Sequence, residues 1–157
     1  MKNRGLIKWL IGAAAVLAAA FLISTYLYRF TIIRGDSMLP AYKDGQFNII
    51  NRWDRNYAAG DVVVFYCDGL EETLVKRVAA CPGDTVLIKG GILYVNGETP
   101  EFYAGTVFAY GGIAESEVRL QEDEYFVIGD NTEVSKDSRY KEVGPVIKNR
   151  ITGKLVF

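Results

Sequence analysis

A run of 20 consecutive residues without a charged side chain, from Trp9 to Tyr28, constrains this chain more than any other feature. As an α-helix, at about 1.5 Å per residue, it spans about 30 Å, which is the thickness of the hydrocarbon core of a bilayer. Trp9 at one end and Tyr26 and Tyr28 at the other are aromatic residues of the kind found at membrane interfaces. The run therefore predicts a transmembrane α-helix over residues 9–28.

Two other interpretations fit an apolar run near an N-terminus: a cleaved signal peptide and a buried core helix. A cleaved signal peptide has an apolar segment of about 7–15 residues before a small-residue cleavage site. Ala18–Ala20 supplies such a site, but the apolar run continues through Ile23. A buried core helix is seldom free of charge for 20 residues. We therefore favour a retained signal anchor.

The charges indicate an orientation for this anchor. The 157 residues carry 18 basic and 19 acidic side chains, and three of the basic ones lie before residue 9. By the positive-inside rule, residues 1–8 are expected in the cytoplasm and residues 29–157 on the outer side of the plasma membrane. No basic stripe follows the anchor, so nucleic acid is not an expected partner.

Beyond residue 29 the sequence is typical of β-structure. Short runs rich in Val, Ile, Phe and Tyr alternate with Gly-containing turn signals, and helical periodicity is scarce. Asn96-Gly97, after a strand-like run, is typical of a tight hairpin turn. The expected fold is all-β, mainly an antiparallel sheet or barrel-like domain, with one N-terminal transmembrane α-helix. Residues 99–116 are the least regular and are expected to form a loop or a small excursion.

The chain contains no histidine. This excludes Ser-His-Asp and Cys-His catalytic sites and histidine-based metal sites. Cys67 and Cys81 cannot make a four-Cys zinc site. In the expected hairpin of the runs DVVVFYC and TLVKRVAA they lie several residue pairs apart, which favours two free thiols. No metal or cofactor is expected, so a catalytic base would have to be a carboxylate, a tyrosine or a lysine with a lowered pKa.

Two residues fit this requirement. Ser37 follows Gly35 and precedes Pro40, which indicates a constrained turn of the kind that holds a nucleophile. Lys76 lies in a predicted strand and shares one face with the apolar residues Leu74, Val78 and Ala80. An apolar setting lowers the pKa of an amine, and a neutral amine can activate a serine hydroxyl. Each residue alone also fits a simpler interpretation, an ordinary turn serine and a lysine that reaches water.

A third polar segment covers residues 129–139, directly after the strand-like run EYFVI. Asp137 and Arg139 could form an ion pair, and Ser135 could fix a neighbouring polar group. A solvated polar loop is the alternative, and spacing alone does not decide between the two.

Together these segments resemble bacterial type I signal peptidases, which are membrane-anchored Ser-Lys proteases. The family's motifs occur in order behind the anchor and cover essentially the whole chain: Gly35-Asp36-Ser37-Met38-Leu39-Pro40, Gly60-Asp61, Lys76-Arg77-Val78-Ala79-Ala80-Cys81-Pro82-Gly83-Asp84, Gly129-Asp130-Asn131 and Ser135-Lys136-Asp137-Ser138-Arg139. Two departures are Ala41, where the family usually has threonine, and Gly35, where some members have a serine that donates to the oxyanion.

The resemblance implies a role for each candidate residue. Ser37 would be the nucleophile, with its backbone N–H as one oxyanion donor, and Lys76 the general base and later the general acid. Ser135 would orient the Lys76 amine, and Asp137 with Arg139 would hold the site together.

The resemblance also implies a substrate and a place. Substrates would be signal peptides of exported preproteins with small residues at positions −1 and −3 from the cut, bound next to the lipid bilayer. The apolar walls of the substrate cleft are expected from Ile32, Ile33, Met38, Leu74 and Val75. The alternatives are a Ser-Lys autoprotease related to self-cleaving repressors, and an inactive membrane-tethered binding module. The span and the lack of a basic DNA-binding segment disfavour the first, and the presence of Ser37 and Lys76 disfavours the second.

Overall fold

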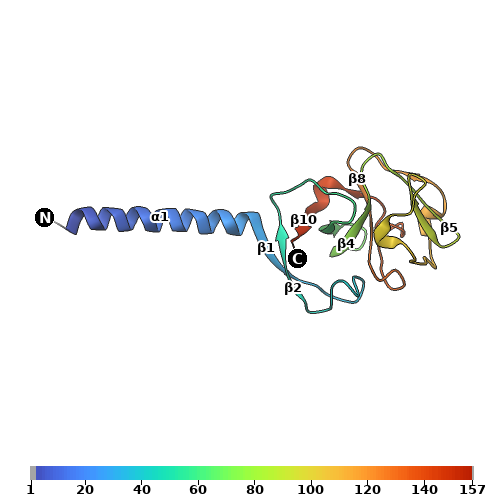
Figure 1. Ribbon diagram of the computed structural model, residues 1–157, viewed down its shortest axis with the longest axis horizontal. Coiled ribbons are helices and arrows are strands. Elements are labelled where there is room, and N and C mark those ends of the chain that lie inside the picture. The colour runs from blue at the N-terminus through green and yellow to red at the C-terminus, as the bar shows by residue number, and fades with distance from the viewer. Residues whose placement is uncertain (1–2, 157) are drawn as a thin grey trace.

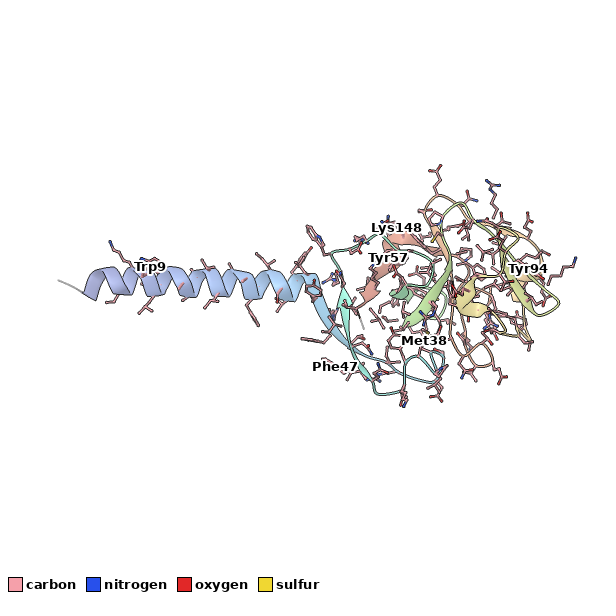
Figure 2. All side chains as sticks on the ribbon, in the orientation of Figure 1. Trp9, Met38, Phe47, Tyr57, Tyr94 and Lys148 are labelled. Carbon is pink, nitrogen blue, oxygen red and sulfur yellow. The ribbon has the colours of Figure 1, made fainter. Side chains whose placement is uncertain are left out.

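The computed structural model describes residues 3–156, and its first element is a helix that extends away from the rest of the molecule. In Figure 1, α1 (Asn3–Leu27) projects as a straight rod from one end of a β domain. The side chains described along it are exposed on every face, as Figure 2 shows around Trp9. Its segment Ile7–Leu27 is long and apolar enough to cross a membrane, and none of it is buried in protein. This exposure rules out the interpretation as a core helix.

The helix boundaries differ from the expected span of 9–28. The helix begins at Asn3, and Tyr28, expected within the span, instead opens the first strand. The reason lies at the junction, where the Leu27 carbonyl accepts a hydrogen bond from the Arg52 N–H at 2.9 Å and Tyr28 pairs with Asn51. Pairing with a neighbouring strand therefore ends the helix one residue before the sequence pattern does.

The β domain consists of two antiparallel sheets and three short 3-10 helices. The larger sheet has seven strands in the order β1 (Tyr28–Ile32), β2 (Phe47–Asn51), β10 (Ile151–Leu155), β3 (Val62–Cys67), β4 (Glu72–Ala80), β8 (Glu124–Ile128) and β9 (Val146–Ile147). The smaller sheet has the order β6 (Ile92–Val95), β5 (Thr85–Lys89) and β7 (Val118–Arg119). The 3-10 helices are η1 (Glu101–Tyr103), η2 (Gly112–Glu115) and η3 (Lys148–Arg150). The prediction of a mainly antiparallel β domain behind one N-terminal helix is confirmed.

Two hydrophobic clusters cover the two faces of the large sheet. One contains Val63, Phe65, Val78 and Val127, and the other lies between the sheets around Phe126 and Ile128. The segment 99–116, expected to be a loop or a small excursion, holds η1 and η2 and buries three residues in the second cluster, namely Tyr103, Phe108 and Ala114. The segment is therefore a small excursion, and its aromatic side chains belong to the core, which the sequence pattern did not indicate.

Strand β4 carries Lys76, and most of this strand is paired on one side only. Residues 72–77 pair with β3, and β8 pairs with β4 only at Arg77, Val78 and Ala80, with a bulge between the last two. In the described part of the chain, the second edge of Glu72–Lys76 thus has no strand partner. Strand β1 is the outer strand at one end of the same sheet, so it also has a free edge. Both free edges border one cleft.

The cysteines lie apart, as their predicted positions required. Cys67 is opposite Glu72, one residue from the expected Thr73, and its thiol contacts the Glu142 carbonyl at 3.6 Å. The Cys81 sulfur lies 3.9 Å from the Tyr57 carbonyl. Among residues 3–156, both cysteines are free thiols.

Candidate active site

Ser37 lies in the loop between β1 and β2, and hydrogen bonds hold this loop on both sides of it. Gly35 has a φ of +79°, which a side chain would disfavour, and its N–H donates to Asp44 Oδ1 at 2.7 Å. The Ser37 carbonyl accepts from the Asn131 N–H at 3.0 Å. The hydroxyl is therefore presented from a fixed turn, as the Gly35–Pro40 motif predicts.

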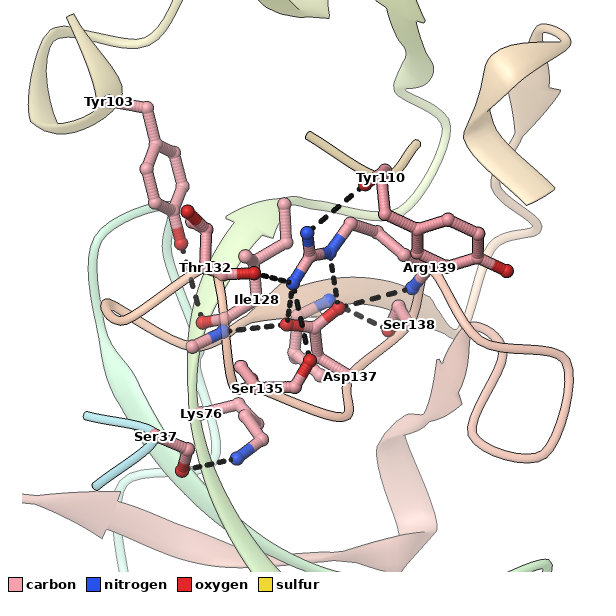
Figure 3. A network of polar contacts seen from close by, with 12 residues as sticks. Ser37, Lys76, Tyr103, Tyr110, Ile128, Thr132, Ser135, Asp137, Ser138 and Arg139 are labelled. Carbon is pink, nitrogen blue, oxygen red and sulfur yellow. Dashed lines mark hydrogen bonds and ion pairs between the residues drawn. The ribbon is translucent and has the colours of Figure 1, made fainter. Parts of the chain in front are cut away.

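Lys76 points from β4 toward this hydroxyl, and its Nζ lies 2.7 Å from Ser37 Oγ (Figure 3). The cross-strand partner of Lys76 is Val63, and its neighbours on the same face are Leu74 and Val78, all apolar. Only 3% of Lys76 is exposed. Burial lowers the pKa of its amine below the usual value, while the negative charges of Asp137 and Glu72 oppose that shift. The geometry therefore favours a neutral amine in contact with a hydroxyl.

Asp137 and Arg139 form a fully buried ion pair behind the dyad, as their spacing allows. Arg139 Nε donates to Asp137 Oδ1 at 2.8 Å, and Nη2 donates to Oδ2 at 2.9 Å. The guanidinium also donates to the carbonyls of Tyr110, Thr132 and Ser135, which come from two separate segments of the chain (Figure 3). The pair thus fastens the whole segment 129–139 to the domain, and a solvated loop is excluded for it.

Ser135 lies beside the Ser37 loop but does not make the expected hydrogen bond to the Lys76 amine. It is fully buried, and within residues 3–156 its Oγ has no hydrogen-bond partner. A side chain at Gly129 would overlap both the Ser135 hydroxyl and the Ser37 carbonyl, so these two groups border the same glycine. The hydroxyl therefore lies unpaired beside the Ser37 loop, and Lys76 Nζ bonds to Ser37 instead.

A second ion pair, which the sequence did not assign to the site, supports it from the opposite face of β4. The Arg77 guanidinium donates to Asp130 through two nitrogens, at 2.7 and 2.6 Å, and to the Gly60 carbonyl at 2.8 Å. Asn131, next to Asp130, holds the Ser37 carbonyl. Strand alternation places Arg77 opposite Lys76, but sequence spacing could not name its distant partner.

Ser37 and Lys76 lie in a cleft of about 650 Å³ between β1, its following loop and the free edge of β4. All five predicted wall residues line it: Ile32, Ile33, Met38, Leu74 and Val75. Ile33 and Met38 are only 1% exposed and form its floor, while the other three are more open. The charged residues that border the cleft are Arg34, Asp36, Glu72 and Lys136. Within the described residues, no three His, Cys, Asp or Glu side chains are grouped to hold a metal ion.

A serine hydroxyl bonded to a buried amine on an antiparallel sheet is the arrangement of a serine hydrolase in which lysine replaces histidine. Comparison with known proteins agrees with this class. The family described as signal peptidase, peptidase S26, matches residues 6–157. The chain belongs to this family and is a serine peptidase.

Individual relatives have similar lengths and names. Signal peptidase IB of Staphylococcus aureus is 32% identical over 175 residues, covering 99% of this chain and 90% of the relative. Signal peptidase I of Bacillus licheniformis is 31% identical, covering 99% and 89%. The crystal structure of a signal peptidase I from Enterococcus faecalis matches with a TM-score of 0.52 and 25% identity, over 64% of this chain and 97% of that one. With the apolar helix α1, these matches indicate a membrane-anchored peptidase.

Proposed function

We propose that Ser37 and Lys76 form the catalytic dyad with which this peptidase removes signal peptides from preproteins. One observation carries the assignment: Lys76 is only 3% exposed, and its Nζ lies 2.7 Å from the Ser37 hydroxyl. An amine kept neutral by burial can take the proton of a hydroxyl at this distance. No histidine exists in the chain to do so.

In the proposed reaction, Lys76 accepts a proton from each nucleophile and gives it to each leaving group. The neutral amine takes the Ser37 proton while Oγ forms a bond to the carbonyl carbon of the scissile peptide. The ammonium then gives this proton to the leaving nitrogen as the C–N bond breaks. The product with the new N-terminus departs at this step. A water, deprotonated by the same amine, then attacks the acyl-serine, and Lys76 returns the proton to Ser37 Oγ as the C–O bond breaks and the signal peptide departs with a new C-terminal carboxyl group.

The oxyanion formed in both attacks requires hydrogen-bond donors. The Ser37 backbone N–H is the proposed first donor, because it belongs to the nucleophile's own turn. The Gly35 N–H is already bonded to Asp44, so it is not the second donor. Ser135 is proposed as a positioning residue. Its unpaired hydroxyl borders the Ser37 loop, and its oxygen can accept a hydrogen bond from the ammonium once Lys76 is charged.

Substrates are proposed to bind as an added strand. The free edges of β4 and β1 border the cleft on two sides, and both offer unpaired backbone groups to an extended peptide. Alternate side chains of such a peptide point to the same wall. Small residues at positions −1 and −3 fit a floor made by the nearly fully buried Ile33 and Met38.

Purified full-length protein in detergent tests this function with a preprotein whose signal peptide has Ala at −1 and −3. We expect a single cut after the −1 residue, identified by mass spectrometry of both products. Replacement of −1 Ala by Leu should reduce cleavage at least about 100-fold, because the closed floor offers no room for it. A matched substrate with Leu at −2, where the side chain points away, should be cut nearly as fast. Equal cleavage of the Leu −1 and Leu −2 substrates would contradict the proposed cleft.

The proposed location is the plasma membrane, with residues 1–8 in the cytoplasm and the β domain on the outer surface. Lys2, Arg4 and Lys8 support this orientation. The outward face of the β1–β2 hairpin, which directly follows α1, supports contact with lipid because its residues are exposed and apolar: Tyr28, Phe30, Ile32, Phe47 and Ile49. Figure 2 shows Phe47 on this side, close to the end of the helix.

Protease added to intact cells tests the orientation. We expect digestion of the β domain, while an epitope at the N-terminus becomes accessible only after the cells are permeabilised. An epitope digested in intact cells would show the reverse orientation. A cytoplasmic protein serves as the control that the membrane stays sealed.

A further inference from the structure

The segment 99–116 makes a polar contact near the site that its part in the core does not require. Tyr103, in η1, is 3% exposed, and its hydroxyl donates a hydrogen bond to the Ile128 carbonyl at 3.3 Å (Figure 3). Ile128 ends β8, directly before the segment 129–139 that carries Ser135. A phenylalanine would fill the same space in the hydrophobic cluster, so packing alone does not account for the hydroxyl.

The Tyr103 hydroxyl holds one end of a peptide unit whose other end is held by Asp137. The Ile128 carbonyl accepts from Tyr103, as described above. The N–H of the same peptide unit belongs to Gly129 and donates to Asp137 Oδ2 at 3.1 Å. In a planar trans peptide the carbonyl and the N–H point in opposite directions. Tyr103 and Asp137 therefore hold this peptide from opposite sides, and together they fix its orientation.

The orientation of this peptide decides where Gly129 lies between two groups of the site. Gly129 has no room for a side chain, because a Cβ atom would overlap the Ser135 hydroxyl and the Ser37 carbonyl. Two residues further along, the Asn131 N–H donates to the same Ser37 carbonyl at 3.0 Å. A rotation of the peptide before Gly129 would thus move it against both Ser135 and the turn that carries the nucleophile.

The segment that carries Tyr103 is itself fastened to Arg139. The Tyr103 ring packs edge-on against Phe108, and the Arg139 guanidinium carbon lies 5.6 Å from the centre of the Phe108 ring. A buried guanidinium over an aromatic face is a favourable contact. Arg139 also donates to the Tyr110 carbonyl at 3.1 Å, and its own carbonyl accepts from the Ile113 N–H at 2.9 Å. These contacts fix Tyr103 relative to the segment 129–139.

The Tyr103 hydroxyl remains a donor across the pH range of an assay. Burial raises the pKa of Tyr103 above the usual value of a tyrosine, and the negative charges of Asp130 and Asp137 raise it further. The hydroxyl therefore stays protonated at a pH where an exposed tyrosine ionises. Its hydrogen bond to the Ile128 carbonyl is kept at neutral and at alkaline pH.

We propose that Tyr103 is a positioning residue of this peptidase, whose hydroxyl holds the Ile128–Gly129 peptide so that Ser135 and the Ser37 turn stay aligned with Lys76. Tyr103 is not among the described residues that line the cleft, so it acts through the peptide and not on the substrate. This inference rests on the proposed function. It gives the segment 99–116 a part in catalysis besides its part in the core.

Tyr103→Phe tests the inference, because it removes the hydroxyl and keeps the ring. For full-length enzyme in detergent, we expect kcat on a preprotein to fall about threefold to tenfold, the effect of one lost hydrogen bond, and KM to stay the same. Tyr125→Phe is the matched control. It removes a hydroxyl from β8, but its ring lies in the hydrophobic cluster around Val63, so kcat should not change. An unchanged kcat in Tyr103→Phe would overturn the inference.

A double variant separates positioning from a loss of folded enzyme. Ser135→Ala removes the group that the peptide aligns, so adding Tyr103→Phe to it should change kcat less than twofold. If the Tyr103 hydroxyl only stabilised the fold, Tyr103→Phe would cause the same fold-loss of kcat with and without Ser135. Equal losses in the two backgrounds would therefore show a merely structural role.

The pH profile is an independent readout, because a loss of folded enzyme does not shift it. A hydrogen bond to Ser135 stabilises the Lys76 ammonium, so its loss lowers the pKa of Lys76. The acid limb of cleavage should lie at lower pH in Tyr103→Phe and in Ser135→Ala than in the unmodified enzyme. The charges around Lys76 are the same in all three proteins, namely Asp137, Glu72, Arg139 and Asp130. A limb that moves only in Ser135→Ala would overturn the inference alone, whereas absence of cleavage by the unmodified enzyme would overturn the proposed function.

Discussion

We expect Ser37→Ala and Lys76→Met each to reduce signal-peptide cleavage by about 10⁴-fold or more, and the double variant to be no slower than either single one. In the proposed reaction the two groups act on one proton, so the loss of either removes the same step, and such effects are strongly non-additive. The measurement is kcat/KM for a preprotein in detergent, made with each single variant and the double. Ser116→Ala and Lys89→Met, at exposed positions on other parts of the β domain, are the matched controls and should keep full activity.

The fold should survive the Lys76→Met change, which separates chemistry from stability. Methionine keeps most of the aliphatic stem and removes an amine whose burial is unfavourable, so the free energy of unfolding should stay equal or rise. Lys76→Arg should be as inactive as Lys76→Met, because a guanidinium stays protonated and cannot act as a base. Cleavage retained in any of these variants would contradict the dyad.

The pH profile of the unmodified enzyme provides a second check on Lys76. The base is active only as a neutral amine, so cleavage must fall as the pH drops through the pKa of Lys76. Burial lowers this pKa from the usual value of a lysine, about 10.5, so the acid limb of the profile should lie clearly below that pH. An acid limb centred at the ordinary lysine pKa would show that the amine is not desolvated.

Much of this arrangement is predictable from sequence because local patterns determine it. The uncharged length of α1 indicates a span whatever the rest of the chain does, and alternation along β4 places Lys76 on an apolar face. The absence of histidine excludes the most common catalytic base, and Lys76 on its apolar face is then a candidate. These features depend on residues near one another in the chain, so no tertiary information is needed to recognise them.

The features that sequence did not reveal depend on distant pairing. Arg77 forms an ion pair with Asp130, 53 positions further along the chain. The end of α1 at Leu27 likewise follows from a bond to Arg52. In each case a local pattern shows which face a side chain occupies, while strand order decides what that face meets.

The buried ion pair gives the second large expected effect: Arg139→Met should destabilise the β domain by about 3–5 kcal/mol. The change leaves the Asp137 carboxylate buried with only the Gly129 and Arg139 backbone N–H groups as donors, and removes the donor from the carbonyls of Tyr110, Thr132 and Ser135. Denaturant unfolding of the full-length protein, followed by tryptophan fluorescence and circular dichroism, measures the loss. The stability of Arg139→Lys should lie between that of the unmodified protein and that of Arg139→Met, because one ammonium cannot make all the hydrogen bonds of the planar guanidinium.

A surface pair of the same chemistry is the matched control. Arg150 and Asp68 are 2.7 Å apart, as close as the buried pair, but their side chains are 51% and 58% exposed. Arg150→Met should therefore cost less than about 1 kcal/mol, since water solvates the carboxylate left behind. Equal losses from Arg139→Met and Arg150→Met would contradict the argument from burial.

Arg139→Met should also shift the pH profile of cleavage, which a purely structural role of Arg139 would not predict. The positive charge of Arg139 lowers the pKa of Lys76, and the negative charge of Asp137 raises it. Removing Arg139 leaves the Asp137 charge unopposed, so the pKa of Lys76 rises and the acid limb of cleavage moves to higher pH. Folded Arg139→Met enzyme, assayed at low temperature where it stays native, should therefore lose more activity at neutral pH than at alkaline pH. An unchanged limb would show that the pair supports the fold without tuning the base.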